Sequence, residues 1–511
     1  MSKIRIRARF TYTTTTAYDT VVDYTDDENS SAKYKKQTEY KIVDAPVTFT
    51  KSMGQWFWGS KTTQSFSSIK IFGATWARTD KHIDTPPKID IYVVVDGVET
   101  KVYEGVAHSI QDLGEDIYEF KLQDLREQFN RPAIKYEWTG INPVDTYPVP
   151  IFAGYGVWGV EPVMYDYATQ KLVFSEFTAL YGTAFYFAVQ GTDGELLDNG
   201  DPLVYTTDYT LASPSSGSTY LLVADLVSSS FGIITGGGRN TSVTYRGLVK
   251  AVESVLWRVY DDPADIPTVT NNAGTWLATN YNNDCDEIGI YADSDETGQD
   301  LLTRFAESIN GFWYVNGAGD VIFDTLRLPE NETAVHTFDQ SNILSKTITT
   351  DVDVAKNATF KVGSRRNYRP LKYSECAMSL TEDEKQLQIN DYRYVSTYAD
   401  VVTLATAEAL PYKSNNELTT ATSVFYRKDM KDYFRSDIQT KDGATRLLWH
   451  LTDLLFEQVR RFYKLEVSVA FTDLELGMVV ALDYNGYNLN LIITNISANI
   501  REGTTKLELW G

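Results

Sequence analysis

The chain contains few of the residues from which metal centres and disulfide frameworks are built. Only two cysteines, Cys285 and Cys376, occur in 511 residues, too few for a disulfide framework or a cysteine-based zinc cluster. We expect both to be reduced thiols in a hydrophobic core. The four histidines show no H-x-x-x-H spacing, so a zinc-protease site is not predicted. No metal or other cofactor is expected.

Long apolar runs are also missing. No apolar stretch approaches the roughly 20 residues that a helix needs to cross a bilayer, so we expect no integral membrane segment. The first ten residues alternate between polar and apolar side chains, which is not the pattern of a signal peptide.

The common catalytic motifs are absent or incomplete. The run Gly236-Gly237-Gly238-Arg239 lacks the Lys-Ser/Thr of a phosphate-binding loop and is predicted to be a flexible connection. Residues 293–298 imitate the start of a calcium loop, but Arg304 stands where the bidentate glutamate is needed. Thr297 is therefore predicted to be the N-cap of a helix. These observations do not predict an enzyme.

Charge and aromatic content point to protein partners. The net charge of −22 argues against non-specific binding to nucleic acid, because phosphates would be repelled. Aromatic residues make up 13% of the chain, and tyrosine and tryptophan suit β-sheets and protein interfaces. Trp56 and Trp58 could stack on a sugar ring, but a core or a subunit interface is the favoured interpretation.

The chain starts with a strict alternation. Arg5, Arg7 and Arg9 face one way and apolar residues face the other, which predicts a half-buried strand. The basic row is interpreted as a solvated sheet face, or as a contact for an acidic neighbour. Further strands are predicted at 68–74, 88–95 and 101–106, with a tight turn at Asp96-Gly97.

Three helices interrupt the predicted strands. Apolar spacing predicts helices at 244–258, 297–310 and, as the longest, 441–463. The second helix precedes a hairpin that turns at 316–320. After the third helix, strands at 489–499 and 504–510 follow a turn at 484–487.

The predicted fold is a β-rich α+β, multidomain protein. It combines tube-like β-barrel or sandwich domains, a helix–hairpin α/β domain, and one long helix before the C-terminal barrel strands. The expected domains are an N-terminal β-barrel domain, a β-rich second domain, an α+β helix–hairpin domain, and a β segment with the long helix and closing strands. Their predicted bounds are 1–135, 136–240, 241–350 and 351–511.

Five local motifs occur in the order found in phage tail-tip hub proteins. They are Val102-Tyr103-Glu104-Gly105-Val106; Tyr118-Glu119-Phe120-Lys121-Leu122 with Asn130-Arg131-Pro132; Pro148-Val149-Pro150-Ile151-Phe152-Ala153-Gly154 leading to Val160-Glu161-Pro162-Val163; Thr297-Gly298-Gln299-Asp300-Leu301-Leu302 leading to Gly311-Phe312-Trp313-Tyr314 and Gly319-Asp320-Val321-Ile322-Phe323; and Leu474-Glu475-Leu476-Gly477-Met478-Val479-Val480. Val149 stands where the family has lysine, and Met478 where it has aspartate. The chain therefore resembles the hubs of contractile baseplates and the hub domains of siphophage tail tips.

The resemblance implies a virion protein that works by assembly. The family forms a homotrimer whose barrels arrange as a pseudo-hexameric ring at the end of the tail tube. It implies a distal tail or tail-tube protein above, the C-terminus of the tape-measure protein in the channel, and a tail fibre or spike below. DNA would pass the lumen without specific binding, and assembly would take place in the host cytoplasm.

Other interpretations remain open. A carbohydrate-binding or carbohydrate-cleaving β-protein would need aromatic platforms and two carboxylates at a fixed separation, which sequence cannot select among 69 acidic residues. Another tail structural role, a distal tail ring or a fibre adaptor, would differ from a hub in its number of copies.

Overall fold

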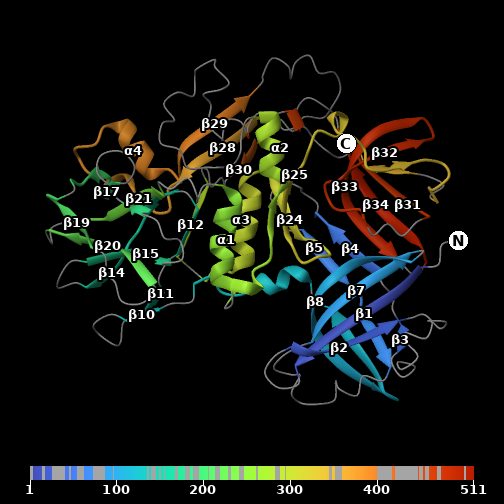
Figure 1. Ribbon diagram of the computed structural model, residues 1–511. Coiled ribbons are helices and arrows are strands. Elements are labelled where there is room, and N and C mark those ends of the chain that lie inside the picture. The colour runs from blue at the N-terminus through green and yellow to red at the C-terminus, as the bar shows by residue number, and fades with distance from the viewer. Residues whose placement is uncertain are drawn as a thin grey trace. The chain divides into compact units, whose positions relative to one another are not determined.

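The computed structural model divides the chain into two compact units (Figure 1). Unit 1 comprises Met1–Gln128, Phe312–Val354 and Gln458–Gly511, and unit 2 comprises Phe129–Gly311 and Ala355–Glu457. The structure describes residues 4–13, 18–25, 41–44, 48–53, 62–72, 87–95, 97–122, 124–134, 137–139, 146–148, 151–154, 156–166, 171–178, 185–187, 195–204, 206–212, 219–227, 232–240, 247–260, 263–281, 288–293, 295–344, 348–351, 359–399, 417–420, 447, 450, 453–454, 460–468, 473–499 and 502–511.

Seven strands of unit 1 form a closed barrel. Their order is β1 (Ile4–Thr13), β2 (Tyr18–Thr25), β3 (Lys41–Asp44), β6 (Ile69–Phe72), β9 (Ile117–Leu122), β8 (Val98–Gly114) and β7 (Lys88–Val95). Alternate residues of these strands point inward and are buried, among them Ile6, Ala8, Phe10, Ile71, Ile89, Ile91, Tyr118 and Phe120. The described interior is therefore a packed core and not a pore.

An eight-stranded sheet is the second large sheet of unit 1. It follows the order β26 (Thr337–Phe338), β32 (Val479–Tyr484), β33 (Tyr487–Asn499), β34 (Thr504–Trp510), β31 (Phe462–Val467) and β27 (Thr349–Asp351), with β4 (Thr48–Ser52) on β33 and β5 (Thr63–Phe66) on β4. The predicted turn at 484–487 is confirmed, since Asn485 and Gly486 have φ of 50° and 88° and join two antiparallel strands.

The hairpin predicted around 316–320 is present between β24 (Gly311–Val315) and β25 (Val321–Thr325). Every residue of both strands is buried. Two short 3-10 helices, η4 (Leu125–Phe129) and η8 (Pro329–Asn331), flank the strands of unit 1 in sequence.

Unit 2 is also β-rich and carries the helices of the described chain. One sheet contains β19 (Tyr209–Ala212), β20 (Thr219–Leu226), β15 (Lys171–Thr178), β12 (Ile151–Gly154) and β23 (Gly289–Ala292), with β14 (Val163–Asp166) on β15; a second contains β13 (Gly156–Val160), β21 (Ile234–Asn240), β17 (Glu195–Asp198) and β18 (Asp201–Pro202), with β16 (Phe185–Phe187) on β21. Smaller elements are β10 (Glu137–Thr139) with β11 (Thr146–Pro148), the sheet β29 (Tyr392–Ala399), β28 (Thr359–Arg366) and β30 (Glu417–Thr420), strand β22 (Val269–Asn271), and 3-10 helices η7 (Pro263–Asp265) and η9 (Tyr373–Glu375).

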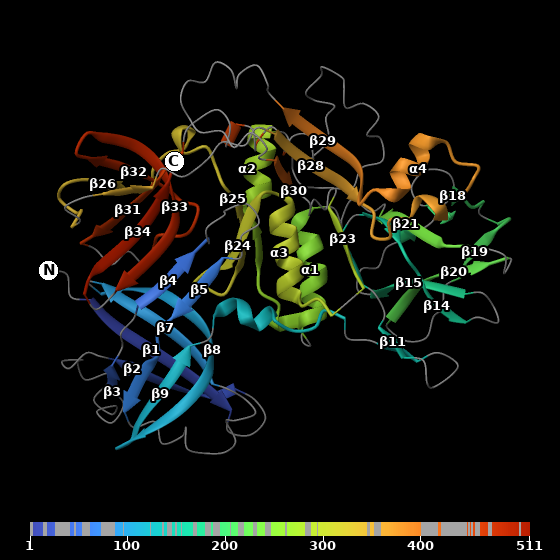
Figure 2. The ribbon, with the colours of Figure 1, turned by 180° about the vertical axis from the view of Figure 1, so that it is seen from behind.

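The described helices are α1 (Leu248–Val259), α2 (Asn272–Tyr281), α3 (Gly298–Ser308) and α4 (Glu382–Ile389). Helices α1 and α3 confirm the predictions at 244–258 and 297–310. They lie side by side in Figures 1 and 2 and pack through buried apolar stripes. The sequence did not predict α2 and α4, because neither carries a strong apolar stripe.

Two local predictions are wrong. The glycine run 236–238 is not a flexible connection but the middle of β21, where Gly236 pairs with Val160 on one side and Leu196 on the other. The long helix does not reach residue 463, because β31 begins at Phe462 and pairs with β34. Most of 441–459 lies outside the described residues.

The two units interleave along the chain, so their edges do not coincide with the predicted boundaries at 135, 240 and 350. Strands β4 and β5 come from the first predicted segment, yet β4 pairs with β33 near the end of the chain and β5 pairs with β4. The β-rich character is as predicted, and the four consecutive domains remain a prediction.

Candidate functional site

The tip of the β24–β25 hairpin is held by one side chain and lies against barrel strand β8. The Asn316 side-chain oxygen accepts hydrogen bonds from the backbone N–H groups of Ala318 and Asp320, both at 2.9 Å. A Cβ on Gly317 would lie 2.6 Å from the carbonyl oxygen of Lys101, so only glycine permits this approach. The motif residue Gly319 has φ of +93°, which glycine also favours.

The motif residue Trp313 is at the centre of a buried polar network. Its side chain is 1% exposed, and the guanidinium of Arg126 lies 5.9 Å from its ring centroid. The Thr62 hydroxyl donates a hydrogen bond to the Trp313 carbonyl. Gln64 Nε2 donates to the carbonyl of Val315, two residues further along β24, at 2.8 Å. These bonds join β5 and η4 to β24.

The motif residue Gly477 joins β24 to the C-terminal sheet. Its φ is +84°, and a Cβ at this position would lie 2.5 Å from Cζ of Phe312. Its N–H donates to the carbonyl of Ile493 on β33 at 2.9 Å. Close by in sequence, Glu475 pairs with Lys51 of β4 at 2.5 Å. Burial, followed by the negative charge of Glu475, raises the pKa of Tyr314 on β24.

Gly105 lies on β8 and faces Tyr103 of the same strand and Leu125 of η4. An added Cβ would lie 2.6 Å from the Tyr103 hydroxyl, which donates to the Val106 carbonyl at 3.0 Å. We use the name hairpin junction for the contacts of β24–β25 with β8, β5, η4 and the C-terminal sheet. The motif residues placed in it are Trp313, Gly319, Asp320 and Gly477.

The other motif residues lie elsewhere. Gly311 is the buried first residue of β24. In unit 2, Gly154 pairs with Gly289 of β23, and Pro162 stands between β13 and β14. Pro150 lies outside the described residues. Sequence reasoning missed Arg126 and Gly317; the turn around Gly317 was recognised, but nothing in the sequence marked Arg126.

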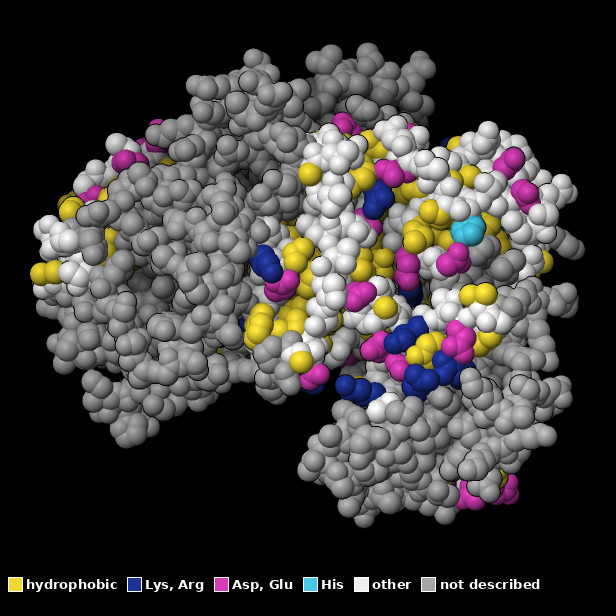
Figure 3. All heavy atoms as spheres, in the orientation of Figure 1, with side chains coloured by type: hydrophobic (Ala, Val, Ile, Leu, Met, Phe, Trp, Pro, Cys, Tyr) yellow, Lys and Arg dark blue, Asp and Glu magenta, His cyan; other side chains and the backbone are white. Residues whose placement is uncertain are grey.

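The predicted basic row lies on the outer wall of the barrel. Arg7 forms two hydrogen bonds with the Glu99 carboxylate, at 2.7 and 2.8 Å, and its guanidinium lies 4.1 Å from the Tyr92 ring centroid. Arg9 lies 6.0 Å from the same centroid. Figure 3 shows Lys and Arg side chains gathered over β7 and β8, interleaved with Asp and Glu. The side chain of Arg5, and all of Trp56 and Trp58, lie outside the described residues.

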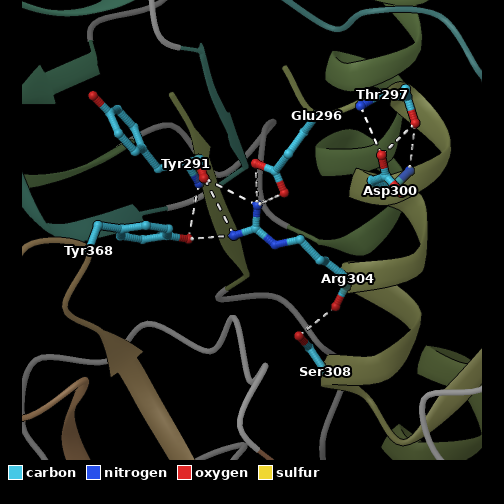
Figure 4. Close-up of polar contacts among 7 residues, drawn as sticks. All are labelled: Tyr291, Glu296, Thr297, Asp300, Arg304, Ser308 and Tyr368. Carbon is cyan, nitrogen blue, oxygen red and sulfur yellow. Dashed lines mark hydrogen bonds and ion pairs between the residues drawn. The ribbon is translucent and has the colours of Figure 1, made fainter. Parts of the chain in front are cut away.

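A second polar cluster stabilises helix α3 in unit 2 (Figure 4). Arg304 pairs with Glu296 at 2.6 Å and also contacts the Tyr291 carbonyl and the Tyr368 hydroxyl at 3.4 Å. Arg304, which stands where a calcium loop would have its bidentate glutamate, therefore neutralises Glu296 of that same segment. Burial raises the pKa of the Tyr291 phenol well above its usual range.

Thr297 is the N-cap of α3, as predicted. Its hydroxyl accepts from the Asp300 N–H at 3.2 Å, and the Asp300 carboxylate accepts from the Thr297 N–H at 3.1 Å. Thr297→Ala is expected to destabilise the first turn by about 1 kcal/mol. Hydrogen exchange should then accelerate about fivefold at the first amides of α3, while those of the capping box at Thr381 on α4 stay unchanged as the internal control. Unchanged exchange at α3 would contradict this role of Thr297.

Histidine and metal-ligand positions show no clustering in the described parts of the chain. His450 packs between the rings of Trp276 and Tyr281, at 5.0 and 5.1 Å. His336 Nε2 lies 3.2 Å from Asp473. Among the described residues, no group of three or more His, Cys, Asp or Glu side chains could hold a metal ion. Within that same part, no helix has the length and apolarity to span a membrane.

Comparison with known proteins gives structural neighbours only. No protein-family model matches the chain, and no curated protein matches it in sequence. The chain is similar to a solved 43 kDa tail protein of prophage MuSo2 from Shewanella oneidensis, with 9% identity, 91% of each chain covered and a TM-score of 0.37. A tail protein from Neisseria meningitidis shares 13% identity over 71% of this chain and 97% of that one, with a TM-score of 0.30. The prophage tail protein gp18 from Listeria monocytogenes shares 8% over 72% and 91%, with a TM-score of 0.27.

All three neighbours are described as tail proteins, two of them from prophages.

Proposed function

We propose that the chain is a structural component of a phage tail tip, a baseplate-hub-type protein that works by assembly. Three copies form a ring that closes the tail tube. The distal tail or tail-tube protein lies above the ring and a fibre or spike lies below it. The tape-measure protein's C-terminus occupies the channel before DNA passes.

The observation that carries this proposal is the hairpin junction. The motif residues that define the resemblance are spread from Gly105 to Gly477, yet four of them, Trp313, Gly319, Asp320 and Gly477, meet around one hairpin. At Gly477 an added Cβ would collide with the Phe312 ring, and at Gly317, within the same hairpin, it would collide with the backbone of β8. Residues required for close packing, and not for chemistry, are what a structural protein family would share.

The filled barrel adds a condition to the proposal. Its described interior is occupied by side chains, so DNA could not pass through one barrel. The channel must lie between copies, with the acidic chain keeping DNA from adhering to its wall.

The test is the oligomeric state and its symmetry. We expect light scattering of the purified full chain, followed by particle averaging, to give a ring of three copies with a central channel. A ring of six would replace the hub with a distal-tail-type ring. A protein that stays monomeric alone and is absent from purified tail tips would overturn the proposal. Activity on host polysaccharides would then be the next measurement.

A further inference from the structure

Asn-Gly pairs are the places in a protein chain that lose ammonia most readily. Glycine has no side chain to shield its backbone nitrogen, so this nitrogen can attack the side-chain carbonyl carbon of the asparagine before it. The chain contains four such pairs, at 199–200, 310–311, 316–317 and 485–486. Because the reacting groups are the same in each pair, the surroundings that the fold supplies decide which pair reacts.

The pair at 316–317 is held in a conformation that prevents the attack. The side-chain oxygen of Asn316 accepts hydrogen bonds from the N–H groups of Ala318 and Asp320, both at 2.9 Å. Its Nδ2 donates to the Asp320 carboxylate at 3.1 Å. The side chain therefore cannot turn toward the backbone nitrogen of residue 317 unless these hydrogen bonds break.

Two further pairs are protected by hydrogen bonds and burial. The side-chain oxygen of Asn199 accepts from the Ile233 N–H at 3.0 Å, and its backbone carbonyl accepts from the Ala377 N–H at 2.8 Å. Asn310 is only 1% exposed, and the glycine that follows it is buried in β24. Solvent base and water reach these two pairs only after local opening of the structure.

The fourth pair forms the tip of the β32–β33 hairpin and is open to solvent. Asn485 and Gly486 are both exposed, and no atom lies within 4 Å of a Cβ built on Gly486. Within the described part of the chain, no hydrogen bond holds the Asn485 side chain or the Gly486 N–H. The end of a hairpin opens at low cost in free energy, so this backbone can reach the geometry of attack.

We propose that Asn485 is a site of self-catalysed deamidation, and that it is the Asn-Gly pair that reacts in the folded protein. The Gly486 nitrogen loses its proton to solvent base and attacks Cγ of Asn485. A C–N bond forms and the Cγ–Nδ2 bond breaks, so ammonia leaves with a proton from water and a succinimide ring remains. Water then opens the ring at either carbonyl, which yields aspartate or isoaspartate. This inference does not depend on the proposed function.

The reaction changes both the charge and the backbone of the turn. Each product adds a carboxylate to the turn, and isoaspartate also lengthens the main chain by a methylene group. The two-residue turn that holds Tyr484 opposite Tyr487 then no longer fits the hairpin. Tyr487 packs edge-on against Tyr463 of β31, with 5.7 Å between the ring centroids, so the change should also disturb this contact.

Incubation of the full chain in mildly alkaline buffer, followed by peptide mass spectrometry of all four pairs, tests the inference. Deamidation at Asn485 should be at least about tenfold faster than at the other three asparagines, because those react only after local opening. In concentrated urea the four rates should converge, since the fold no longer distinguishes the pairs. Equal rates in the folded chain would overturn the inference, and so would rates that differ as much in urea as in buffer.

Two variants keep the turn and remove the reaction. Asn485→Gly combined with Gly486→Asn preserves composition and charge, and Gly-Asn also suits a two-residue turn. The asparagine then precedes Tyr487, whose side chain shields the attacking nitrogen. Gly486→Ala shields the nitrogen with a methyl group.

In both variants, deamidation at the turn should fall to the level of Asn316. Hydrogen exchange at Tyr487 should accelerate during incubation of the wild-type chain and stay constant in the variants. Deamidation that persists at the turn in either variant would show that the backbone nitrogen after the asparagine is not the attacking group, and the proposal would be wrong.

Discussion

Arg460→Met is expected to lower the free energy of unfolding by about 3 kcal/mol, since it leaves a partly buried carboxylate without its partner. The Arg460 side chain is 3% exposed and binds Glu330 through two hydrogen bonds, at 2.7 and 2.9 Å. Its guanidinium lies 5.5 Å from the Trp510 ring centroid. Urea unfolding of the full chain, followed by tryptophan fluorescence, measures the loss.

The matched control is Lys464→Met on the nearby strand β31. Lys464 pairs with Glu508 at 3.1 Å, but its side chain is 55% exposed. Its removal should therefore change stability by less than about 1 kcal/mol. If the two variants lose the same stability, burial of the Arg460 pair has no special importance.

The Arg460 pair also predicts a pH dependence. Burial opposes ionisation of Glu330, but hydrogen bonds and the charge of Arg460 outweigh burial and lower the pKa from 4.5. A lowered pKa means that the stabilisation is present above the ordinary pKa and disappears as pH falls through the lowered one. The stability difference between wild type and Arg460→Met should thus shrink below about pH 4.

Gly477→Ala is expected to lower the free energy of unfolding by about 3 kcal/mol, from two separate causes. The residue has a left-handed φ of +84°, which disfavours any Cβ. The new Cβ would also lie 2.5 Å from the Phe312 ring inside the hairpin junction, where neither strand can shift freely.

Gly486→Ala separates these causes. Its φ is +88°, but no atom lies within 4 Å of an added Cβ. Gly486→Ala should therefore lower the free energy of unfolding only by the cost of the left-handed backbone conformation, about 1 kcal/mol. Thermal unfolding of both variants gives the comparison, and similar losses would show that Phe312 relaxes away from residue 477. Phe312→Leu combined with Gly477→Ala should recover part of the loss if the collision is real.

Local patterns predicted the elements whose stabilisation is local. The helix at 297–310 was identified because its cap, its apolar stripe and the following turn all lie within some 25 residues, and α3 with the β24–β25 hairpin follows. The same holds for β1 and for the turn at 484–487. Helix α2 was missed, since its face of small and polar residues produces no strong period.

The predictions from sequence were wrong where pairing with distant strands decides the backbone conformation. The three glycines at 236–238 indicate a loop by composition, yet neighbours on both sides supply hydrogen bonds that make them a strand. Arg460 falls within the predicted helix 441–463, yet its partner in the structure, Glu330, is 130 residues away.

By itself, the sequence determined the β-rich class, the position of the basic strand and the cap of α3. It also identified a set of motif residues, but not what each of them contacts. Only the tertiary structure decided that β4 pairs with β33 and β5 with β4, outside the barrel, and that four motif residues meet at one hairpin junction. The physical reason is that periodicity and capping report interactions between near neighbours in the chain. Whether a Cβ added at a glycine would collide with a neighbour depends on which surfaces the fold brings together. The same is true of pairing between strands that are hundreds of residues apart.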